Sequence, residues 1–338
     1  MADRWRVVAF GAVVLTVLAG TGGYVWHERT RQADEVRAAP AVPTRDDLAA
    51  VRDAPHLVFR STALGQGYGT VAMVSLDAPD GPRAFTPAHC ERVYATGADA
   101  VCLSAERGLV TKYRAQLLGE NWAPVRDLPL TGIPSRTRLS RDGAYAATTT
   151  FVFGDSYANP GQFSTRTVVT GADGTAYGDL ENFALTVDGR RNTSPDRNLW
   201  GVTFAGGDRF YATAASGGKT WLVEGSLSRK AVTALHADVE CPSLSPDGTR
   251  VAYKKHGKLP AGQWRLAVLD LRTGAETLLA ETRSVDDQAE WLDDDTVLYG
   301  LARAGEGTST SDIWRVPADG TGAPAVYVHD AWSPAVVR

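Results

Sequence analysis

Carboxylate side chains cluster just before and on one predicted strand of this sequence. Asp286 and Asp287 precede that strand and Glu290 lies on it, while Glu240 occupies the comparable position in the repeat unit before it. Carboxylates that converge from several strands can bind a cation or act together as a general acid and base. They can also present charge to a ligand or a protein partner. Glu240, Asp286, Asp287 and Glu290 are therefore the candidate binding residues.

A structural interpretation of these carboxylates is equally open. Arg92 and Arg136 lie in other repeat units and can neutralise the carboxylates in ion pairs. The aspartate run 293–295 falls at a predicted hairpin turn, where turn chemistry explains it without a metal. We expect no metal site and no cofactor.

Catalytic motifs are absent from the sequence. It contains no G-x-S-x-G, H-E-x-x-H, P-loop or dinucleotide-binding fingerprint, and its six histidines are scattered singly. The segment Ser245-Pro246-Asp247-Gly248 lacks the spacer of a sialidase Asp-box. We therefore expect no catalytic residue and a protein that binds a ligand or a protein partner. The alternative function is that of an envelope hydrolase or lyase acting on a glycan.

The cysteines leave one disulfide open. Three cysteines are too few for a disulfide scaffold, and their spacing matches no metal pattern. Cys90 and Cys102 fall in consecutive predicted strands, and a bridge between them would suit an exported domain. A hairpin that turns at 97–99 places Cys102 opposite Val93 or Tyr94, however, so the bridge requires a displaced start of the first strand. Cys241 lies in a distant unit and is the less suitable partner.

The N-terminus predicts a membrane helix. A short tail, residues 1–6, precedes Val7–Trp26, which is 20 residues long and carries no charge. As a helix this stretch would be roughly 30 Å long, the thickness of a bilayer core. We expect an uncleaved signal-anchor over 7–26, with a cleaved signal peptide as the alternative. Arginines flank both ends, so the charge bias does not set the orientation. A short tail before a long domain favours export.

A polar segment, residues 27–55, separates this helix from the remaining chain. Its prolines and mixed charges are typical of a solvated linker. Within it, Thr44 and Asp47 can cap one short helix over Arg45–Arg52.

From His56 to the end, the chain repeats a four-strand unit about every 40 to 50 residues, the period of propeller blades. Five complete units are predicted, and the first two strands of each form a hairpin around a turn rich in Gly and Asp. The hairpins are Glu91–Leu103, Arg136–Thr150, Trp200–Ala214, Cys241–Lys254 and Glu290–Leu301. The third strands are Tyr113–Leu118, Ser164–Thr170, Thr220–Gly225, Trp264–Leu271 and Asp312–Val316. The fourth strands are Val125–Leu130, Thr175–Leu180, Ala231–Leu235, Glu276–Ala280 and Ala323–Val328.

The two ends of the repeat region supply a sixth unit. Leu57–Ser61, Thr70–Leu76 and Arg83–Thr86 have the pattern of a blade that lacks its first strand, and Asp330–Val337 has the pattern of a first strand alone. We therefore predict an all-β, six-bladed β-propeller over 56–338, closed by the C-terminal strand. Closure protects strand edges that an open array would expose.

The unit between Arg136 and Trp200 is longer than the others. Its additional residues fall in Gly154–Gln162 and in Glu181–Arg197, and the second of these contains a hairpin signal at Asp188-Gly189. Long loops on a rigid ring often carry recognition, although a plain insertion explains either one.

The segment Ser245-Pro246-Asp247-Gly248-Thr249-Arg250-Val251-Ala252-Tyr253 resembles the repeat of TolB-like six-bladed β-propellers, a WD40-like repeat. Asp312–Gly320 is similar to that family's third strand and following turn. The resemblance covers residues 56 to 338 by period and is closest in the last two units. It implies an extracytoplasmic propeller that binds partners through its channel mouth or loops. TolB itself has an α/β domain ahead of its propeller, and residues 27–55 are too few for one, so a role in the Tol machinery does not carry over.

Composition adds limits on the partners. The net charge of −4 argues against nucleic acid, which would need a clustered basic face. The cationic residues are 29 Arg and 6 Lys, a bias typical of GC-rich bacterial genomes. Together with the resemblance, these features describe a membrane-anchored, TolB-like protein of GC-rich Gram-positive bacteria. We expect its propeller to be a monomeric ring on the extracytoplasmic side and its partner to be a protein of the cell envelope.

Overall fold

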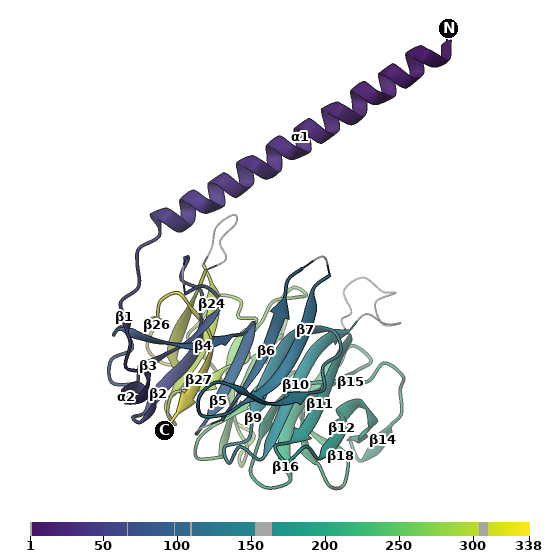
Figure 1. Cartoon of the computed structure of the whole chain (residues 1–338). Coiled ribbons are helices and arrows are strands. Elements are labelled where there is room, and N and C mark those ends of the chain that lie inside the picture. Colours follow the sequence, from purple (N-terminus) through teal and green to yellow (C-terminus); the bar gives the residue numbers. More distant parts are fainter. Residues whose placement is uncertain (1, 66, 98, 109, 153–163, 304–309) are drawn as a thin grey trace.

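The computed structural model describes residues 2–65, 67–97, 99–108, 110–152, 164–303 and 310–338. These residues form six sheets and a long N-terminal helix that stands apart from them (Figure 1). The innermost strand of each sheet contacts the innermost strand of the next, and the last contacts the first. The predicted six-bladed β-propeller is therefore confirmed.

The blades are numbered here in chain order. Blade 1 consists of β1 (Thr44–Arg45), β4 (Arg83–His89), β3 (Thr70–Ser75), β2 (His56–Ser61) and β27 (Ala331–Val337). Blade 2 consists of β5 (Arg92–Thr96), β6 (Asp99–Glu106), β7 (Lys112–Leu118) and β8 (Pro124–Leu128). Blade 3 consists of β9 (Ile133–Leu139), β10 (Tyr145–Val152), β11 (Ser164–Gly171) and β12 (Ala176–Asp179).

The second half of the ring repeats the same order of strands. Blade 4 consists of β15 (Asn198–Phe204), β16 (Arg209–Ser216), β17 (Lys219–Ser226), β18 (Ala231–Ala237), β13 (Ala184–Val187) and β14 (Arg190–Asn192). Blade 5 consists of β19 (Glu240–Leu244), β20 (Arg250–Lys255), β21 (Arg265–Asp270) and β22 (Glu276–Leu278). Blade 6 consists of β23 (Glu290–Trp291), β24 (Thr296–Ala302), β25 (Ser311–Pro317) and β26 (Ala325–Val328).

Blade 1 closes the ring. β27 pairs antiparallel with β2 from His56–Val337 to Ser61–Ala331, so the last strand of the chain becomes the innermost strand of the first blade. Ala331 and Ala335 are fully buried there. The Ser333 hydroxyl also receives the Val93 N–H and donates to the Val93 carbonyl in blade 2. The closure predicted from the sequence is therefore present.

The same turn links the first two strands in blades 3 and 5. In Ser245–Gly248 the Ser hydroxyl donates to the Asp247 carboxylate, which accepts the Thr249 N–H, and Gly248 has a φ of +72°. These hydrogen bonds lower the pKa of Asp247 to about 2, although desolvation opposes them. Blade 3 has the same arrangement in Ser140–Gly143. The motif that carries the family resemblance therefore encodes turn geometry.

The N-terminal region differs from the predicted linker. Helix α1 spans Ala2–Ala38, past the expected end at Trp26, because no proline or glycine follows Gly23 before Pro40. Its segment Val8–Ala38 is long and apolar enough to cross a membrane. The most apolar 18-residue stretch of this segment has a mean hydropathy of 1.8, and none of that stretch is buried. A long apolar N-terminal helix is a feature of secreted or membrane-anchored chains.

The end of the predicted linker is part of the ring. β1 (Thr44–Arg45) adds a parallel strand to the outer edge of blade 1, beside β4. Helix α2 begins at Leu48 and ends at Arg52, with Asp47 accepting the Ala50 N–H as its N-cap. The helix predicted over Arg45–Arg52 is therefore shorter, since Arg45 pairs in a strand. Val51 packs into the core of blades 1 and 2.

The insertion over Glu181–Arg197 belongs to blade 4 and not to the unit between Arg136 and Trp200, to which the sequence pattern assigns it, because its first strand pairs with the outer strand of blade 4. A short 3-10 helix, η2 (Leu180–Asn182), leads into β13, which turns at Asp188-Gly189 and pairs with β14. β13 also pairs in parallel with β18, so the insertion extends the outer edge of this blade. The other predicted insertion, Gly154–Gln162, lies outside the described residues.

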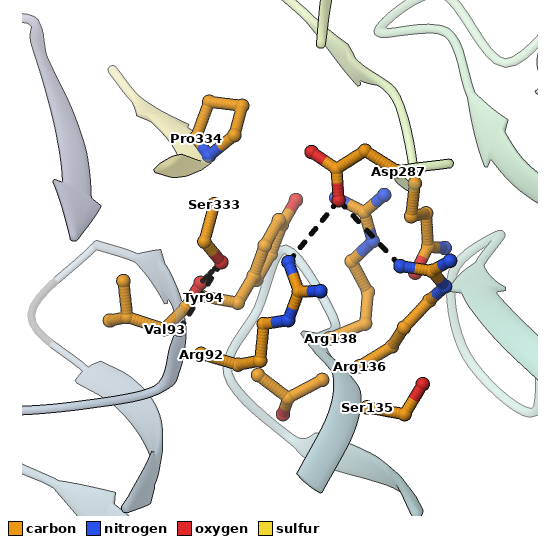
Figure 2. Close-up of a pocket in the computed structure, with 11 residues that line it drawn as sticks. Arg92, Val93, Tyr94, Ser135, Arg136, Arg138, Asp287, Ser333 and Pro334 are labelled. Carbon is orange, nitrogen blue, oxygen red and sulfur yellow. Dashed lines mark hydrogen bonds and ion pairs between the residues drawn. The ribbon is translucent and has the colours of Figure 1, made fainter. Parts of the chain in front are cut away.

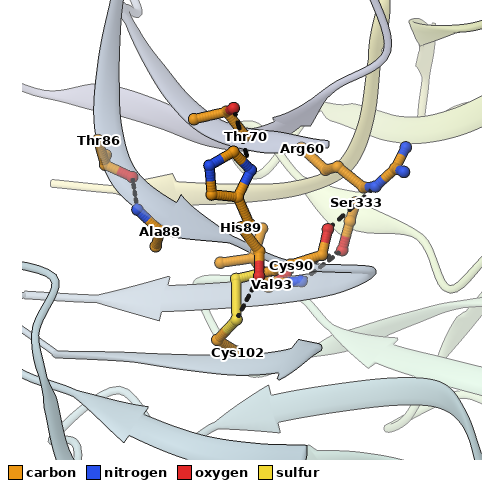
Figure 3. Close-up of a disulfide and its surroundings, with 9 residues drawn as sticks. All are labelled: Arg60, Thr70, Thr86, Ala88, His89, Cys90, Val93, Cys102 and Ser333. Atoms are coloured by element: carbon orange, nitrogen blue, oxygen red, sulfur yellow. Dashed lines mark hydrogen bonds between the residues drawn. A yellow bond between two sulfur atoms is a disulfide. The ribbon is translucent and has the colours of Figure 1, made fainter. Parts of the chain in front are cut away.

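A disulfide joins Cys90 to Cys102 beside the ring closure (Figure 3). The strand register places Cys102 opposite Val93, as the turn position predicts. Cys90 reaches it from the chain between β4 and β5, where its N–H donates to the Gly69 carbonyl and its carbonyl accepts Arg60 Nε at 3.0 Å. The two Cα atoms are 5.4 Å apart. The displaced chain segment that the bridge requires is therefore present, and Cys241 is free and buried.

Deleting Asp330–Arg338 should destabilise the ring far more than an average tail deletion, because it removes the innermost strand of blade 1. We expect the melting temperature to fall by roughly 10 °C or more, since domains of this size lose about 2–4 °C per kcal/mol. Deleting Arg338 alone leaves β27 complete and is the control. Thermal unfolding followed by circular dichroism measures both. A full deletion that melts within a degree or two of the parent would contradict the closure.

The disulfide predicts a specific pattern of thiol labelling. Intact cells are quenched in acid, the unfolded chain is alkylated, and its peptides are analysed by mass spectrometry. Only Cys241 should be modified, because a Cys90–Cys102 bridge forms and persists in an oxidising compartment. Reduction before alkylation is the control and should expose all three thiols. Three modified cysteines without reduction would contradict both the bridge and an exported propeller.

Candidate functional site

Side chains from the innermost strands of all six blades meet in the central channel. These strands are β27, β5, β9, β15, β19 and β23. Residues near the starts of several of them line a small cavity at one end, here called the entrance, and residues near their ends line a larger cavity at the other end, here called the exit. The candidate carboxylates are distributed between the entrance and the middle of the channel.

Asp287 is buried at the entrance between two arginines. Its Oδ1 lies 3.4 Å from Arg92 Nη1 and 3.6 Å from Arg136 Nη1 (Figure 2). Its Oδ2 accepts the Gly300 N–H at 3.0 Å. A Cβ at Gly300 would lie 2.8 Å from this oxygen and 2.5 Å from the Trp332 ring, so glycine is required for the contact. Asp287 therefore has its partners within the protein.

Asp286 lies beside Asp287 but points outward. Its side chain is 63% exposed, whereas those of its partners Arg136 and Lys254 are 10% and 3% exposed. Oδ1 accepts from Lys254 Nζ at 2.7 Å and from Arg136 Nη2 at 3.1 Å. Desolvation by the channel wall opposes ionisation, but Lys254 and Arg136 lower the pKa of Asp286 overall. Asp286 is therefore an ionised, positioned carboxylate at the entrance.

Glu240 stands on the same rim. Its Oε1 accepts the Trp264 indole N–H at 2.9 Å, and the Lys254 ammonium lies 4.0 Å from the centroid of the Trp264 ring. Lys254 is thus held between an aromatic face and the Asp286 carboxylate. The structure brings Glu240 and Asp286 together through this lysine.

Glu290 lies deeper and is 7% exposed. It pairs with Arg138, and the Tyr94 hydroxyl donates to its Oε1 at 3.2 Å. Burial raises the pKa of Glu290 in spite of Arg138, and burial together with Glu290 raises the pKa of Tyr94 to about 12. Arg138 also donates to the Ser243 hydroxyl and the Ala289 carbonyl. This pair holds blades 3, 5 and 6 together across the channel.

Sequence reasoning identified Arg92 and Arg136 as partners of the acidic residues but missed the other two cations. Arg138 lies two residues after Arg136 on β9, and a period of two places both side chains on one face of the strand. That spacing could have identified it. Lys254 stands near the end of a second strand, β20, and only the fold brings it to the channel. Cys241, which receives a hydrogen bond from Arg136 Nε at 3.2 Å, carried no sequence signal either.

The site is therefore a compensated charge network. Each of Asp286, Asp287 and Glu290 lies within ion-pair distance of at least one arginine or lysine. Among the described residues, no group of three or more His, Cys, Asp or Glu side chains is placed to hold a metal ion. Asp286 faces outward and Glu240 is half-buried beside Trp264, whereas Asp287 and Glu290 lie in the channel interior. The arrangement can therefore present oriented charge at its entrance.

Solved structures with the same fold include TolB. The TolB structure from Acinetobacter baumannii matches 84% of this chain and 67% of its own, with 15% sequence identity and a TM-score of 0.57. A puromycin-hydrolyzing peptidase from Mycobacterium tuberculosis matches 81% of this chain and 43% of its own, with 16% identity and a TM-score of 0.46. Likeness at this identity shows the fold alone, which is TolB-like. No protein-family model matches the sequence, and no curated protein matches it.

Replacing Arg138 should destabilise the ring, because Arg138→Gln leaves Glu290 buried without its cation. We expect a loss of about 3–5 kcal/mol in the free energy of unfolding, the usual cost of breaking a buried ion pair from one side. Urea denaturation measures it. The matched control is Arg114→Gln, which breaks an ion pair with Glu106. The side chains of Arg114 and Glu106 are 52% and 54% exposed. That change should cost less than about 1 kcal/mol. Equal losses in the two variants would contradict the structural role of Arg138.

Proposed function

We propose that this chain is a membrane-anchored, extracytoplasmic binding module without enzymatic activity, which holds a protein partner of the cell envelope at its channel entrance. The observation that carries the proposal is the position of Asp286. Its Oδ1 is fixed by two buried cations, and its side chain remains 63% exposed at the rim. Among the described residues, none donates a hydrogen bond to Oδ2, so this oxygen is available to a partner.

The chemistry of the entrance favours one kind of partner group. An oriented, exposed carboxylate accepts hydrogen bonds from arginine, lysine or main-chain N–H groups. Because Lys254 and Arg136 already hold Asp286 in position, little side-chain entropy is lost when a donor binds. Glu240 adds a second carboxylate on the same rim, hydrogen-bonded to Trp264. A partner segment that carries a cationic side chain complements this surface.

The location rests on two features of the chain. The apolar helix α1 fits an anchor that follows a short N-terminal tail, and the Cys90–Cys102 disulfide fits an oxidising compartment. The TolB-like fold supports a binding role but does not specify a partner, because one fold serves many functions. The channel charges support the absence of catalysis, since Asp286, Asp287 and Glu290 are engaged by cations of the protein itself.

The experiment compares partner capture by variants of the full-length chain. The tagged protein is purified from detergent-solubilised envelopes after mild crosslinking, and co-purified proteins are quantified by mass spectrometry. The wild type should return a specific envelope protein, and Asp286→Ala should recover at least about tenfold less of it, which corresponds to 1.4 kcal/mol. The control is Asp127→Ala, which removes an exposed carboxylate from β8 on the outer edge of blade 2.

Two results would overturn the proposal. One is the absence of any protein that is enriched over a control purification. The other is full recovery of the partner with Asp286→Ala, provided that the variant melts at the temperature of the wild type.

A further inference from the structure

The exit of the channel contains a cavity of about 290 Å³, which Asp286 and Asp287 do not line, although Tyr94 and Arg138 line both channel cavities. Every blade contributes to its wall. The contributions of the six innermost strands include Thr96, Leu139, Phe204, Ser243, Trp291 and Val336. The cavity therefore exists only in the closed ring, and its size approaches the lower end of small-molecule sites, about 300 Å³.

The cavity has an excess of positive charge. Arg138, Arg141 and Arg338 line it, and Glu290 is its only acidic lining residue in the described part of the chain. Glu290 is already engaged by Arg138 and the Tyr94 hydroxyl. Arg141 donates only to main-chain carbonyls, those of Ser245 and Pro246 across the exit. No carboxylate of the described residues lies within ion-pair distance of Arg141, so its charge remains available to an anion.

Arg138 provides a donor without a partner. Its side chain is 5% exposed, and its Nη1 and Nη2 are engaged by Glu290, Ser243 and Ala289. Its Nε–H is buried and has no hydrogen-bond partner among the described residues. A buried donor left unpaired costs about 1–3 kcal/mol, which an acceptor or a water molecule in the cavity would recover.

Rigid aromatic side chains flank these cations. Trp291 is 3% exposed, and its indole N–H donates to the Ser243 carbonyl at 2.8 Å. Phe204 is 7% exposed and stacks on Tyr145, with ring centroids 5.9 Å apart. Fixed aromatic groups beside an arginine favour a ligand that has both a charged group and a flat apolar body.

From these observations we infer that the exit cavity is a second binding site, which takes a small organic carboxylate with a planar body. The carboxylate lies against the guanidinium of Arg141 and within reach of Arg138, and the planar body packs against Phe204 and Trp291. This site lies at the opposite end of the channel from Asp286. It goes beyond the proposed function, because it binds a small molecule and needs no protein partner.

The test uses benzoate and its neutral analogue benzamide as probes of the full-length chain in detergent micelles. Ligand-observed NMR titration should give a dissociation constant for benzoate on the order of 1 mM, typical of a small fragment. Benzamide has the same shape without the charge and should bind at least about tenfold more weakly. Arg141→Gln should weaken benzoate binding by about tenfold, since it removes the unpaired cation. The control variant, Arg114→Gln on the third strand of blade 2, β7, should bind benzoate as the wild type does.

Three outcomes would overturn the inference. They are the absence of saturable benzoate binding to the wild type, equal binding of benzamide and benzoate, and unchanged benzoate affinity in Arg141→Gln. The comparison of the two probes uses only the wild type, so it remains decisive if the Arg141 variant folds poorly.

Discussion

The pairing of β27 with β2 is the interaction on which the rest of the structure depends. A propeller blade protects its edges only when its neighbours are in place, and the first and last blades are neighbours only in a closed ring. Here closure is shared between two elements from opposite ends of the chain. The Ser333 bridge to Val93 and the nearby Cys90–Cys102 disulfide reinforce the same junction. Both channel cavities have walls that include residues of β27.

Closure also dictates the chemistry of the channel. Six strands direct side chains into one narrow space, where an unpaired charge is costly. The chain meets this constraint with cations from blades 2, 3 and 5 and carboxylates next to or on β23 of blade 6. The ion pairs inside the channel leave two charged groups that the protein itself does not fully engage. One is the exposed carboxylate of Asp286, and the other is the guanidinium of Arg141.

Much of the fold could be predicted from the sequence, because each blade combines strand periodicity with turn residues whose geometry is local. The hairpin at Cys241–Lys254 and the closing strand are examples, and both are present. Helix α1 extends past the apolar stretch that ends at Trp26, since hydrophobicity falls there but no helix breaker occurs before Pro40.

The site was predictable only in part. The carboxylates stood out because they are close together in sequence, and Arg92 and Arg136 could be named as partners. The contributions of Lys254 and Tyr94 depend on distances across the ring, from β20 to Asp286 and from β5 to Glu290. The exit cavity is formed by single residues from six separate strands, and no local pattern in the sequence marks such a set.

The docking of β1 onto blade 1 limits how the propeller is presented. Helix α1 ends at Ala38 and β1 begins at Thr44, so only residues 39–43 connect the helix to the ring. Such a segment spans at most about 18 Å, at up to roughly 3.6 Å per residue. If residues 7–26 lay in a membrane, the 12 residues of α1 that follow them would add roughly 18 Å, at 1.5 Å per residue, and the connecting segment up to about 18 Å more. The ring would then stay close to the membrane, which favours partners that are embedded in that membrane or lie near its surface.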